Sequence, residues 1–222
     1  PEQAAMRTPG RLGRYSKALS YAQLDARSDA IAAGLGKRGI ARGSRVVVMV
    51  RPTPEFFLLM FALFKRGAVP VLVDPGIAKR ALKQCLDEAQ PQAFIGIPLA
   101  MLAKKLLGWA SSAHVRITTG RNAWWADATL AQVEAEGAGA GPQLAATGGD
   151  EVAAILFTSG STGVPKGVVY RHRHFIAQIE MLGRAFGIEA GGIDLPTFPP
   201  FALFDPALGL TSIIPDMDPT RP

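Results

Sequence analysis

The hydrophobic residues near the start of the chain have helical spacing. Ser20 and Gln23 form the Ser-x-x-Gln pattern of a helix capping box, and Leu24, Ile31 and Leu35 follow on one helical face. The pattern predicts an amphipathic helix that packs against a core.

Further along, short apolar runs alternate with helical spacing. Runs of Val, Ile and Leu predict strands, and the segments between them predict helices. Such an alternation is typical of βα units, so we predict an α/β fold with mainly parallel sheets and flanking helices. The predicted strands cover residues 46–50, 69–73, 93–97, 115–118 and 152–157, and the predicted helices cover 54–66, 78–89 and 99–109.

The regular pattern weakens after residue 118. Residues 137–149 contain few large apolar side chains and are typical of a flexible connector. We therefore predict a first α/β subdomain at 1–136, a connector at 137–149 and the start of a second α/β subdomain at 150–222. The adjacent Trp124 and Trp125, before the connector, are interpreted as packed loop anchors.

The composition is that of a globular protein, and it bears on the possible partners and cellular location. Of 222 residues, 48% are hydrophobic, which is enough for a substantial core. The 24 Lys+Arg residues outnumber the 18 Asp+Glu residues, but they are scattered, so we predict no nucleic-acid partner. Cys85 is the single cysteine and is expected as a small buried residue, which fits a cytoplasmic protein. The apolar run at 56–64 is about half as long as a membrane span, so we expect a core helix and no transmembrane segment or signal peptide.

A glycine-rich loop carries the clearest chemical signal. The apolar run that begins at Val152 stops abruptly in the sequence Thr-Ser-Gly-Ser-Thr-Gly-Val-Pro-Lys-Gly at 158–167. Glycines let backbone N–H groups approach an anion, and the hydroxyl and ammonium groups add further donors, so the loop is predicted to bind a polyphosphate. The predicted ligands are Thr158, Ser159, Gly160, Ser161, Thr162, Gly163, Lys166 and Gly167.

Other chemistries fit these residues less well. A Walker loop requires Ser or Thr after its Gly-Lys pair, whereas Lys166 lies between Pro165 and Gly167. The loop serines do not lie in a Gly-x-Ser-x-Gly elbow, which excludes the serine hydrolase pattern. His172 and His174 lack a surrounding Asp, Glu or Cys cluster, so helix capping or packing is favoured over a metal site.

The loop resembles the Thr-Ser-Gly-Ser/Thr-Thr-Gly-x-Pro-Lys-Gly signature of the adenylate-forming superfamily. Residues 19–24, 64–75 and 167–174 resemble three other family segments. The resemblance implies the N-terminal part of the adenylate-forming fold, with ATP and Mg²⁺ as cofactors. It also implies that Lys166 and Thr162 are catalytic and that Thr158 contacts Mg²⁺ through ATP.

Residues 195–203 resemble the family segment that borders the acyl pocket. The predicted pocket residues are Phe198, Pro199 and Phe201. The family has His where this chain has Pro199, and Gly where it has Ala202. A buried proline-rich turn is the alternative interpretation, and the two interpretations are compatible.

Residues 74–76, 199–205 and 214–222 resemble the β-lactone-forming branch of this superfamily, which serves bacterial long-chain olefin biosynthesis. The resemblance implies a small-molecule, fatty-acid-derived substrate, a long-chain 2-alkyl-3-hydroxy fatty acid, which ATP activates as an acyl adenylate with release of pyrophosphate and which then closes to a β-lactone. It also implies assembly with other olefin-biosynthesis enzymes. A long-chain acyl-CoA ligase or a fatty acyl-AMP ligase is the alternative activity. An unrelated nucleotide-binding module and a noncatalytic interaction protein are weaker hypotheses. Later family motifs are missing, so we expect an N-terminal piece that is inactive alone, with the C-terminal remainder absent.

Overall fold

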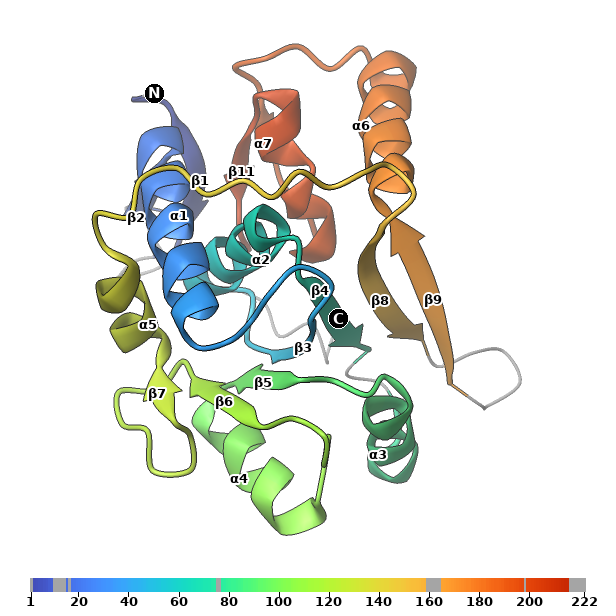
Figure 1. Ribbon diagram of the computed structural model, residues 1–222. Coiled ribbons are helices and arrows are strands. Elements are labelled where there is room, and N and C mark those ends of the chain that lie inside the picture. Colours follow the sequence, from blue (N-terminus) through green and yellow to red (C-terminus); the bar gives the residue numbers. More distant parts are fainter. Residues whose placement is uncertain are drawn as a thin grey trace.

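The computed structural model describes residues 2–9, 15, 17–74, 77–158, 165–197 and 199–215. They form two β-sheets with helices packed around them (Figure 1). The strands are β1 (Ala4–Thr8), β2 (Lys17–Ser20), β3 (Arg45–Met49), β4 (Val69–Val73), β5 (Ala93–Gly96), β6 (Val115–Thr118), β7 (Ala128–Thr129), β8 (Val152–Thr158), β9 (Lys166–Arg171), β10 (Ile193–Asp194) and β11 (Thr211–Ile213). The helices are α1 (Tyr21–Lys37), α2 (Pro54–Arg66), α3 (Lys79–Glu88), α4 (Pro98–Leu107), α5 (Leu130–Gly137), α6 (His172–Phe186), the short 3-10 helix η2 (Pro199–Leu203) and α7 (Asp205–Leu208).

The larger sheet has the strand order β7-β6-β5-β3-β4-β8-β9. Its described pairs are parallel except for β8 and β9, which form an antiparallel hairpin. Alternate residues of β3 enter different cores: Val46 and Val48 pack with α1 and α2, whereas Val47 packs with α3 and α4. Burial of both faces explains why β3 reads as a continuous apolar run.

The smaller sheet has the order β10-β11-β1-β2. Helix α2 lies between the two sheets, since one core cluster contains Met6 of β1, Phe57 of α2 and Val46 of β3. A helix in such a place is apolar on every side, and residues 56–60 are all buried. Pro54 begins this helix and Gly67 ends it with φ 66°. The predicted core helix is confirmed.

The predicted α/β class and its parallel strands are confirmed, as is the capping box of α1. Ser20 Oγ accepts a hydrogen bond from the Gln23 N–H, and Gln23 Oε1 accepts one from the Ser20 N–H. Cys85 is buried as expected. Trp125 packs against the core, but the interpretation of Trp124 as a packed anchor is wrong, because its side chain is 78% exposed.

Several short elements were missing from the sequence prediction: β1, β2, β7, α5, β10 and β11. A sequence signal existed for α5, since Thr129 and Gln132 form a second capping box. The end of the predicted loop, at 166–167, is instead the start of β9.

Strands on both sides of residues 137–149 share the same sheets. β4 pairs with β8, and β1 pairs with β11. The boundary at 137–149 therefore does not separate two sheets, and the division into subdomains stays a prediction. The segment itself is anchored, because the Gln143 N–H donates to Asp29 and the Ala145 N–H donates to the Lys65 carbonyl.

Among the residues that the structure describes, no helix combines the length and the apolar character that crossing a bilayer requires.

Candidate functional site

The predicted phosphate loop joins the two strands of the β8–β9 hairpin. Thr158, the last residue of β8, is paired with Lys166, the first residue of β9. Both side chains are exposed. The structure thus brings together the two ends of the loop, each with a hydrogen-bond donor. Five predicted ligands between these ends lie outside the described residues: Ser159, Gly160, Ser161, Thr162 and Gly163.

Strand β8 leads into the loop at the carboxyl edge of the larger sheet. Val73 of β4 pairs with Phe157 of β8, and the Asp74 N–H donates to the Phe157 carbonyl at 3.0 Å. Asp74 therefore lies beside the start of the loop. Parallel sheets bind ligands outside the carboxyl ends of their strands, because loops from several strands meet there.

Gly167 is required by close packing within the hairpin. It lies opposite Phe157, and a Cβ atom added at Gly167 would lie 3.0 Å from the Phe157 ring. The ring therefore occupies the space that a side chain on Gly167 would need. This contact assigns Gly167 a packing role in addition to its predicted place in the loop.

The far end of the hairpin is held by hydrogen bonds and an ion pair. The His172 N–H donates to the Glu151 carbonyl at 3.1 Å, and His174 Nδ1 accepts a hydrogen bond from the Arg171 N–H at 3.1 Å. Arg42 forms a bidentate ion pair with Glu151, and hydrogen bonding to Arg42 is the main reason that the pKa of Glu151 falls to about 2.

The two histidines begin α6 in this arrangement. Burial lowers the pKa of His172, against the opposing effect of the nearby Glu151 carboxylate. The bond to His174 Nδ1 caps the helix, so the predicted capping role is confirmed for His174. The described residues contain no group of three metal-binding side chains.

A chain of aromatic rings connects β9 with η2. Tyr170 stacks on Phe175 with ring centroids 5.5 Å apart, Phe175 lies 6.1 Å from Phe204, and Phe204 lies 6.4 Å from Phe201. The segment that resembles the acyl-pocket border is therefore linked to the hairpin through Phe204 and through Phe175 of α6. Phe198 and the side chain of Pro199 lie outside the described residues.

Phe201 also lines a cavity of about 740 Å³. The cavity lies between α6, β10, η2 and α7, and Leu182, Phe186 and Leu208 make much of its wall apolar. Asp205 also lines this cavity and accepts a hydrogen bond from the Ser212 hydroxyl. Burial raises the pKa of Asp205 to about 6, and the neighbouring Asp194 also raises it.

Comparison with known proteins shows the family of the chain that forms this hairpin and these sheets. A family model described as "AMP-binding enzyme" matches residues 1–201, which is most of the chain. The chain belongs to this family. The match supports the superfamily that the loop sequence indicated.

Two curated relatives of this AMP-binding family member are highly similar over its whole length. It is 73% identical to an olefin beta-lactone synthetase of Xanthomonas campestris pv. campestris and 71% identical to an olefin beta-lactone synthetase of Stenotrophomonas maltophilia. The chain spans 41% of the length of each relative.

The fold has a close structural counterpart. The N-terminal domain of FACL13 from Mycobacterium tuberculosis superposes with a TM-score of 0.82 at 24% identity, covering 100% of this chain and 55% of that domain structure. This likeness confirms the predicted N-terminal part of the adenylate-forming fold.

Sequence reasoning missed several residues of this region. Asp194 and Asp205 are far from the loop in sequence, and the local sequence does not reveal that Asp205 will be buried, and Asp194 half-buried, beside a cavity. The aromatic partners Phe175 and Phe204 were also missed, because their contact joins α6 to the residue that precedes α7.

Proposed function

We propose that the full-length protein activates the carboxyl group of a long-chain 2-alkyl-3-hydroxy fatty acid with ATP and closes it to a β-lactone. The observation that carries this proposal is the 73% identity, over all of this chain, to an olefin beta-lactone synthetase. The β8–β9 hairpin supplies a physical basis, since its ends bring a hydroxyl and an ammonium group to one loop.

The proposed reaction has two steps. The substrate carboxylate attacks the α-phosphorus of ATP, and pyrophosphate leaves, giving an acyl adenylate. The β-hydroxyl of the same molecule then attacks the activated carbonyl, AMP leaves, and the hydroxyl proton passes to phosphate or solvent. Ring closure is favoured because both reacting groups belong to one molecule.

Lys166 and Thr162 are the proposed catalytic residues. The ammonium group of Lys166 would hold the β- and γ-phosphates while negative charge develops on pyrophosphate. The other proposed phosphate ligands are Thr158, Ser159, Gly160, Ser161, Gly163 and Gly167. These assignments rest on the loop sequence and on the positions of Thr158, Lys166 and Gly167 at its ends.

The donor set fits a magnesium nucleotide. Mg²⁺ commonly keeps several waters and binds phosphate oxygens with few protein ligands, so a single hydroxyl suffices on the protein side. Thr158 is the proposed hydroxyl. When bound, Mg²⁺ would neutralise charge on the phosphates.

We further propose that the acyl chain enters the cavity beside Phe201. The apolar wall of this cavity suits an alkyl group, and the aromatic contacts from Phe201 through Phe175 to Tyr170 connect it with β9. Phe198 and Pro199 are proposed to contribute to the same pocket.

Assembly with other olefin-biosynthesis enzymes and a cytoplasmic location also stay proposals. Co-purification from cells tests the assembly.

The deciding experiment uses the full-length protein, ATP, Mg²⁺ and a 2-alkyl-3-hydroxy fatty acid. Pyrophosphate release is measured, and the organic product is identified by mass spectrometry with and without coenzyme A. The proposal expects a β-lactone in both cases. A thioester formed only with coenzyme A would instead favour an acyl-CoA ligase, and an acyl adenylate that accumulates would favour a fatty acyl-AMP ligase.

A further inference from the structure

Helix α4 exposes an apolar face. Ala100 and Met101 are buried against the sheet, whereas Leu99 and Leu106 are 69% and 71% exposed. Residues seven positions apart share one side of a helix, and Leu102 lies between them on that side. A helix at a protein surface ordinarily directs polar residues to solvent, so leucines on this side require an explanation.

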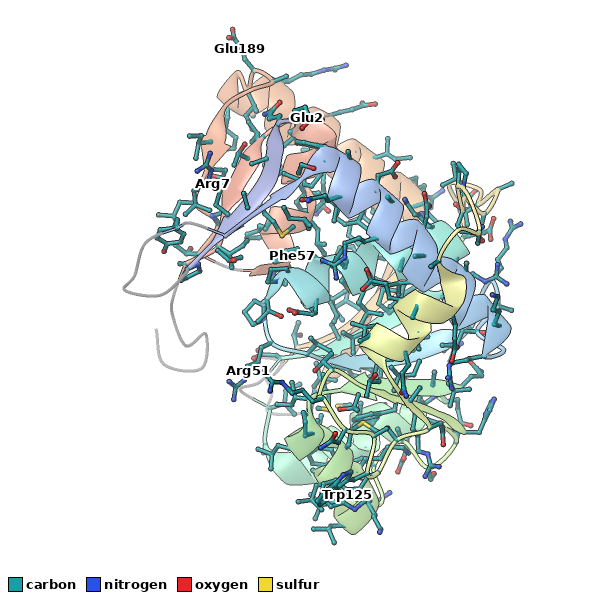
Figure 2. All side chains as sticks on the ribbon, turned by 90° about the vertical axis from the view of Figure 1, so that its left-hand side faces the viewer. Glu2, Arg7, Arg51, Phe57, Trp125 and Glu189 are labelled. Carbon is teal, nitrogen blue, oxygen red and sulfur yellow. The ribbon has the colours of Figure 1, made fainter. Side chains whose placement is uncertain are left out.

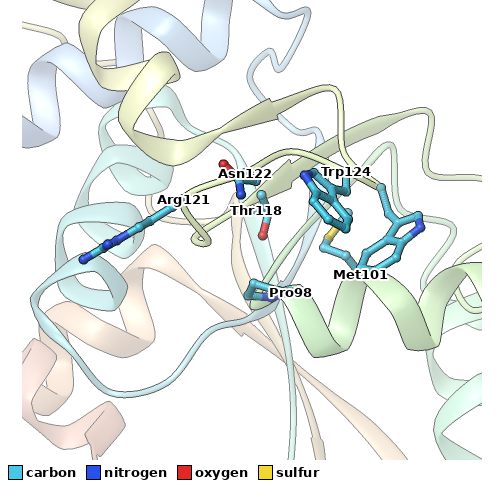
Figure 3. A pocket seen from close by; sticks show the side chains of 7 residues that line it. Pro98, Met101, Thr118, Arg121, Asn122 and Trp124 are labelled. Atoms are coloured by element: carbon cyan, nitrogen blue, oxygen red, sulfur yellow. The ribbon is translucent and has the colours of Figure 1, made fainter.

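The loop after β6 extends this apolar surface. Trp124 is 78% exposed and makes an edge-to-face contact with Trp125, with ring centroids 6.1 Å apart. Figure 3 shows the cavity of about 310 Å³ that these rings line together with Pro98 and Met101 of α4. The tryptophan loop and α4 meet at this cavity, and we call their apolar side chains the α4–tryptophan surface: Leu99, Leu102, Leu106 and Trp124. Lys105 on α4 and Arg121 in the loop belong to the same two segments.

This surface is at one end of the molecule. Figure 2 shows Trp125 at the end opposite Glu189, and Figure 1 shows α4 at the same end. An exposed helix with an adjacent loop at the tip of a molecule can lie against a flat surface.

The charge of the segment has one sign. Residues 98–125 contain four basic residues, Lys104, Lys105, Arg116 and Arg121, and no Asp or Glu. Arg116 is paired with Asp127, and Lys104 donates to the carbonyls of Trp109 and Ala110. In the described part of the chain, Lys105 and Arg121 form no ion pair, so their charges are available to an external anion.

We propose that the α4–tryptophan surface binds a lipid bilayer that contains anionic lipid. Exposed leucines, a tryptophan and basic residues on one surface are the combination that inserts shallowly at a membrane interface: the apolar groups enter the acyl boundary, tryptophan lies at the headgroups, and basic side chains contact lipid phosphates. The absence of acidic residues from 98–125 favours an anionic surface as the occupant. The inference goes beyond the proposed function and does not depend on it.

The first test is sedimentation of the full-length protein with vesicles. Vesicles of phosphatidylethanolamine with phosphatidylglycerol should bind the protein, and binding should weaken as salt is raised, because Lys105 and Arg121 contribute screened attraction. Vesicles of phosphatidylcholine alone should bind it less. Equal binding to both vesicle types at all salt concentrations, or no binding to either, would overturn the proposal.

A matched pair of variants tests the surface itself. Leu106→Asp places a charge on the α4–tryptophan surface and should reduce vesicle partitioning at least about tenfold. Leu144→Asp makes the same change at a leucine that is 85% exposed in the 137–149 segment, and it should change partitioning less than about twofold. Both variants should retain the circular dichroism spectrum and melting temperature of the wild type, because neither leucine is buried.

A second measurement places tryptophan at the membrane. Brominated lipids should quench the tryptophan fluorescence of Trp124→Phe less than that of the wild type. Trp109→Phe alters a buried ring, so brominated lipids should quench its fluorescence at least as much as that of the wild type. Equal vesicle binding by Leu106→Asp and Leu144→Asp would refute the assignment. A dimer that Leu106→Asp dissociates, without vesicle binding by the wild type, would show that a second copy covers the surface and would overturn the membrane proposal.

Discussion

The Lys166 side chain is exposed, so its charge is available to a bound phosphate and it contributes little to packing. It is the exposed first residue of β9, and its backbone is paired with Thr158. In the full-length protein, we expect Lys166→Ala to reduce the rate of pyrophosphate release roughly thirty- to a thousandfold, because the loss of one phosphate donor raises a barrier by about 2–4 kcal/mol.

The fold should tolerate this substitution, so the melting temperature should stay close to that of the wild type. Lys83→Ala is the control, because Lys83 is also a surface lysine and pairs with Asp87 on α3. Wild-type turnover in Lys166→Ala would remove this residue from the mechanism.

Asp205 predicts a pH dependence of stability. Its pKa is raised from 3.8 to about 6, mainly by burial, so the folded state retains a proton that the unfolded state releases. The stabilising contribution is complete below the unfolded pKa and is lost as the pH rises through about 6. The Asn side chain of Asp205→Asn stays neutral at every pH, so this variant should not lose stability in that range. Between acidic and slightly alkaline pH, the free energy of unfolding of the wild type should therefore fall by up to about 2–3 kcal/mol relative to that of the variant.

Urea denaturation at several pH values measures this difference. Asp150→Asn is the control, because the Asp150 side chain is 79% exposed. A wild-type protein whose stability does not fall through pH 6 relative to Asp205→Asn would contradict the assignment. The neighbouring Asp194 and the Tyr21 hydroxyl are the other titratable groups of this cluster.

At the scale of elements, α1 and α5 pack at a distance that only glycine allows. A Cβ atom at Gly34 would lie 1.9 Å from the Val133 carbonyl oxygen, and one at Gly137 would lie 1.8 Å from the Ala30 carbonyl oxygen. Gly137→Ala should force the helices apart and cost about 1–3 kcal/mol of unfolding free energy.

Gly149→Ala is the matched control for this helix contact. A Cβ atom at Gly149 would meet the Arg173 Cβ at 3.6 Å, an ordinary contact, so the cost should stay within about 0.5 kcal/mol. Equal denaturation midpoints for the two alanine variants would show that the helices can separate without penalty.

The elements that sequence predicted correctly are those with a buried, regular pattern. Val46 to Val48 are buried on both sides of β3, and residues 56–60 of α2 lie between two sheets, so the apolar pattern follows directly from burial. β1 and β11 have polar residues such as Arg7 and Ser212, and each is stabilised by a partner remote in sequence. A local pattern does not reveal such pairing.

In the candidate site too, features that depend on local sequence could be predicted, and features that depend on long-range contacts could not. Polyphosphate binding could be predicted from the loop sequence because donor type and glycine spacing are local properties of residues 158–167, and it stays a prediction. The place of Asp74 beside Phe157 required the pairing of β4 with β8. The link from Tyr170 to Phe201 required ring contacts between segments that are separate in the sequence. Those relations arise only when the chain folds.

At the scale of the molecule, the 137–149 segment is fastened across two helices. Asp29 of α1 accepts hydrogen bonds from Lys65 of α2 at 2.7 Å and from the Gln143 N–H at 2.9 Å. The Asp29 and Lys65 side chains are only 14% and 16% exposed. Asp29→Ala should therefore cost about 1–3 kcal/mol and make the segment more sensitive to limited proteolysis.

Asp25→Ala removes the other carboxylate that contacts Lys65, but the Asp25 side chain is 74% exposed. Its cost should stay below about 1 kcal/mol, and its cleavage pattern should match the wild type. Cleavage within 137–149 at equal rates in both variants would show that Asp29 does not hold the segment.

The pairing of β1 with β11 also has a consequence for protein synthesis. The Thr211 hydroxyl donates to the Ala4 carbonyl across 207 residues of chain, and β1 lies directly beside β11 in the smaller sheet. At a translation rate of roughly 5–20 residues per second, about 10–40 seconds separate the emergence of these two strands from the ribosome. During that interval β1 has one unpaired edge, which a nascent chain must keep from pairing with other chains. The edge of β1 is therefore exposed to intermolecular strand pairing until β11 has been synthesised.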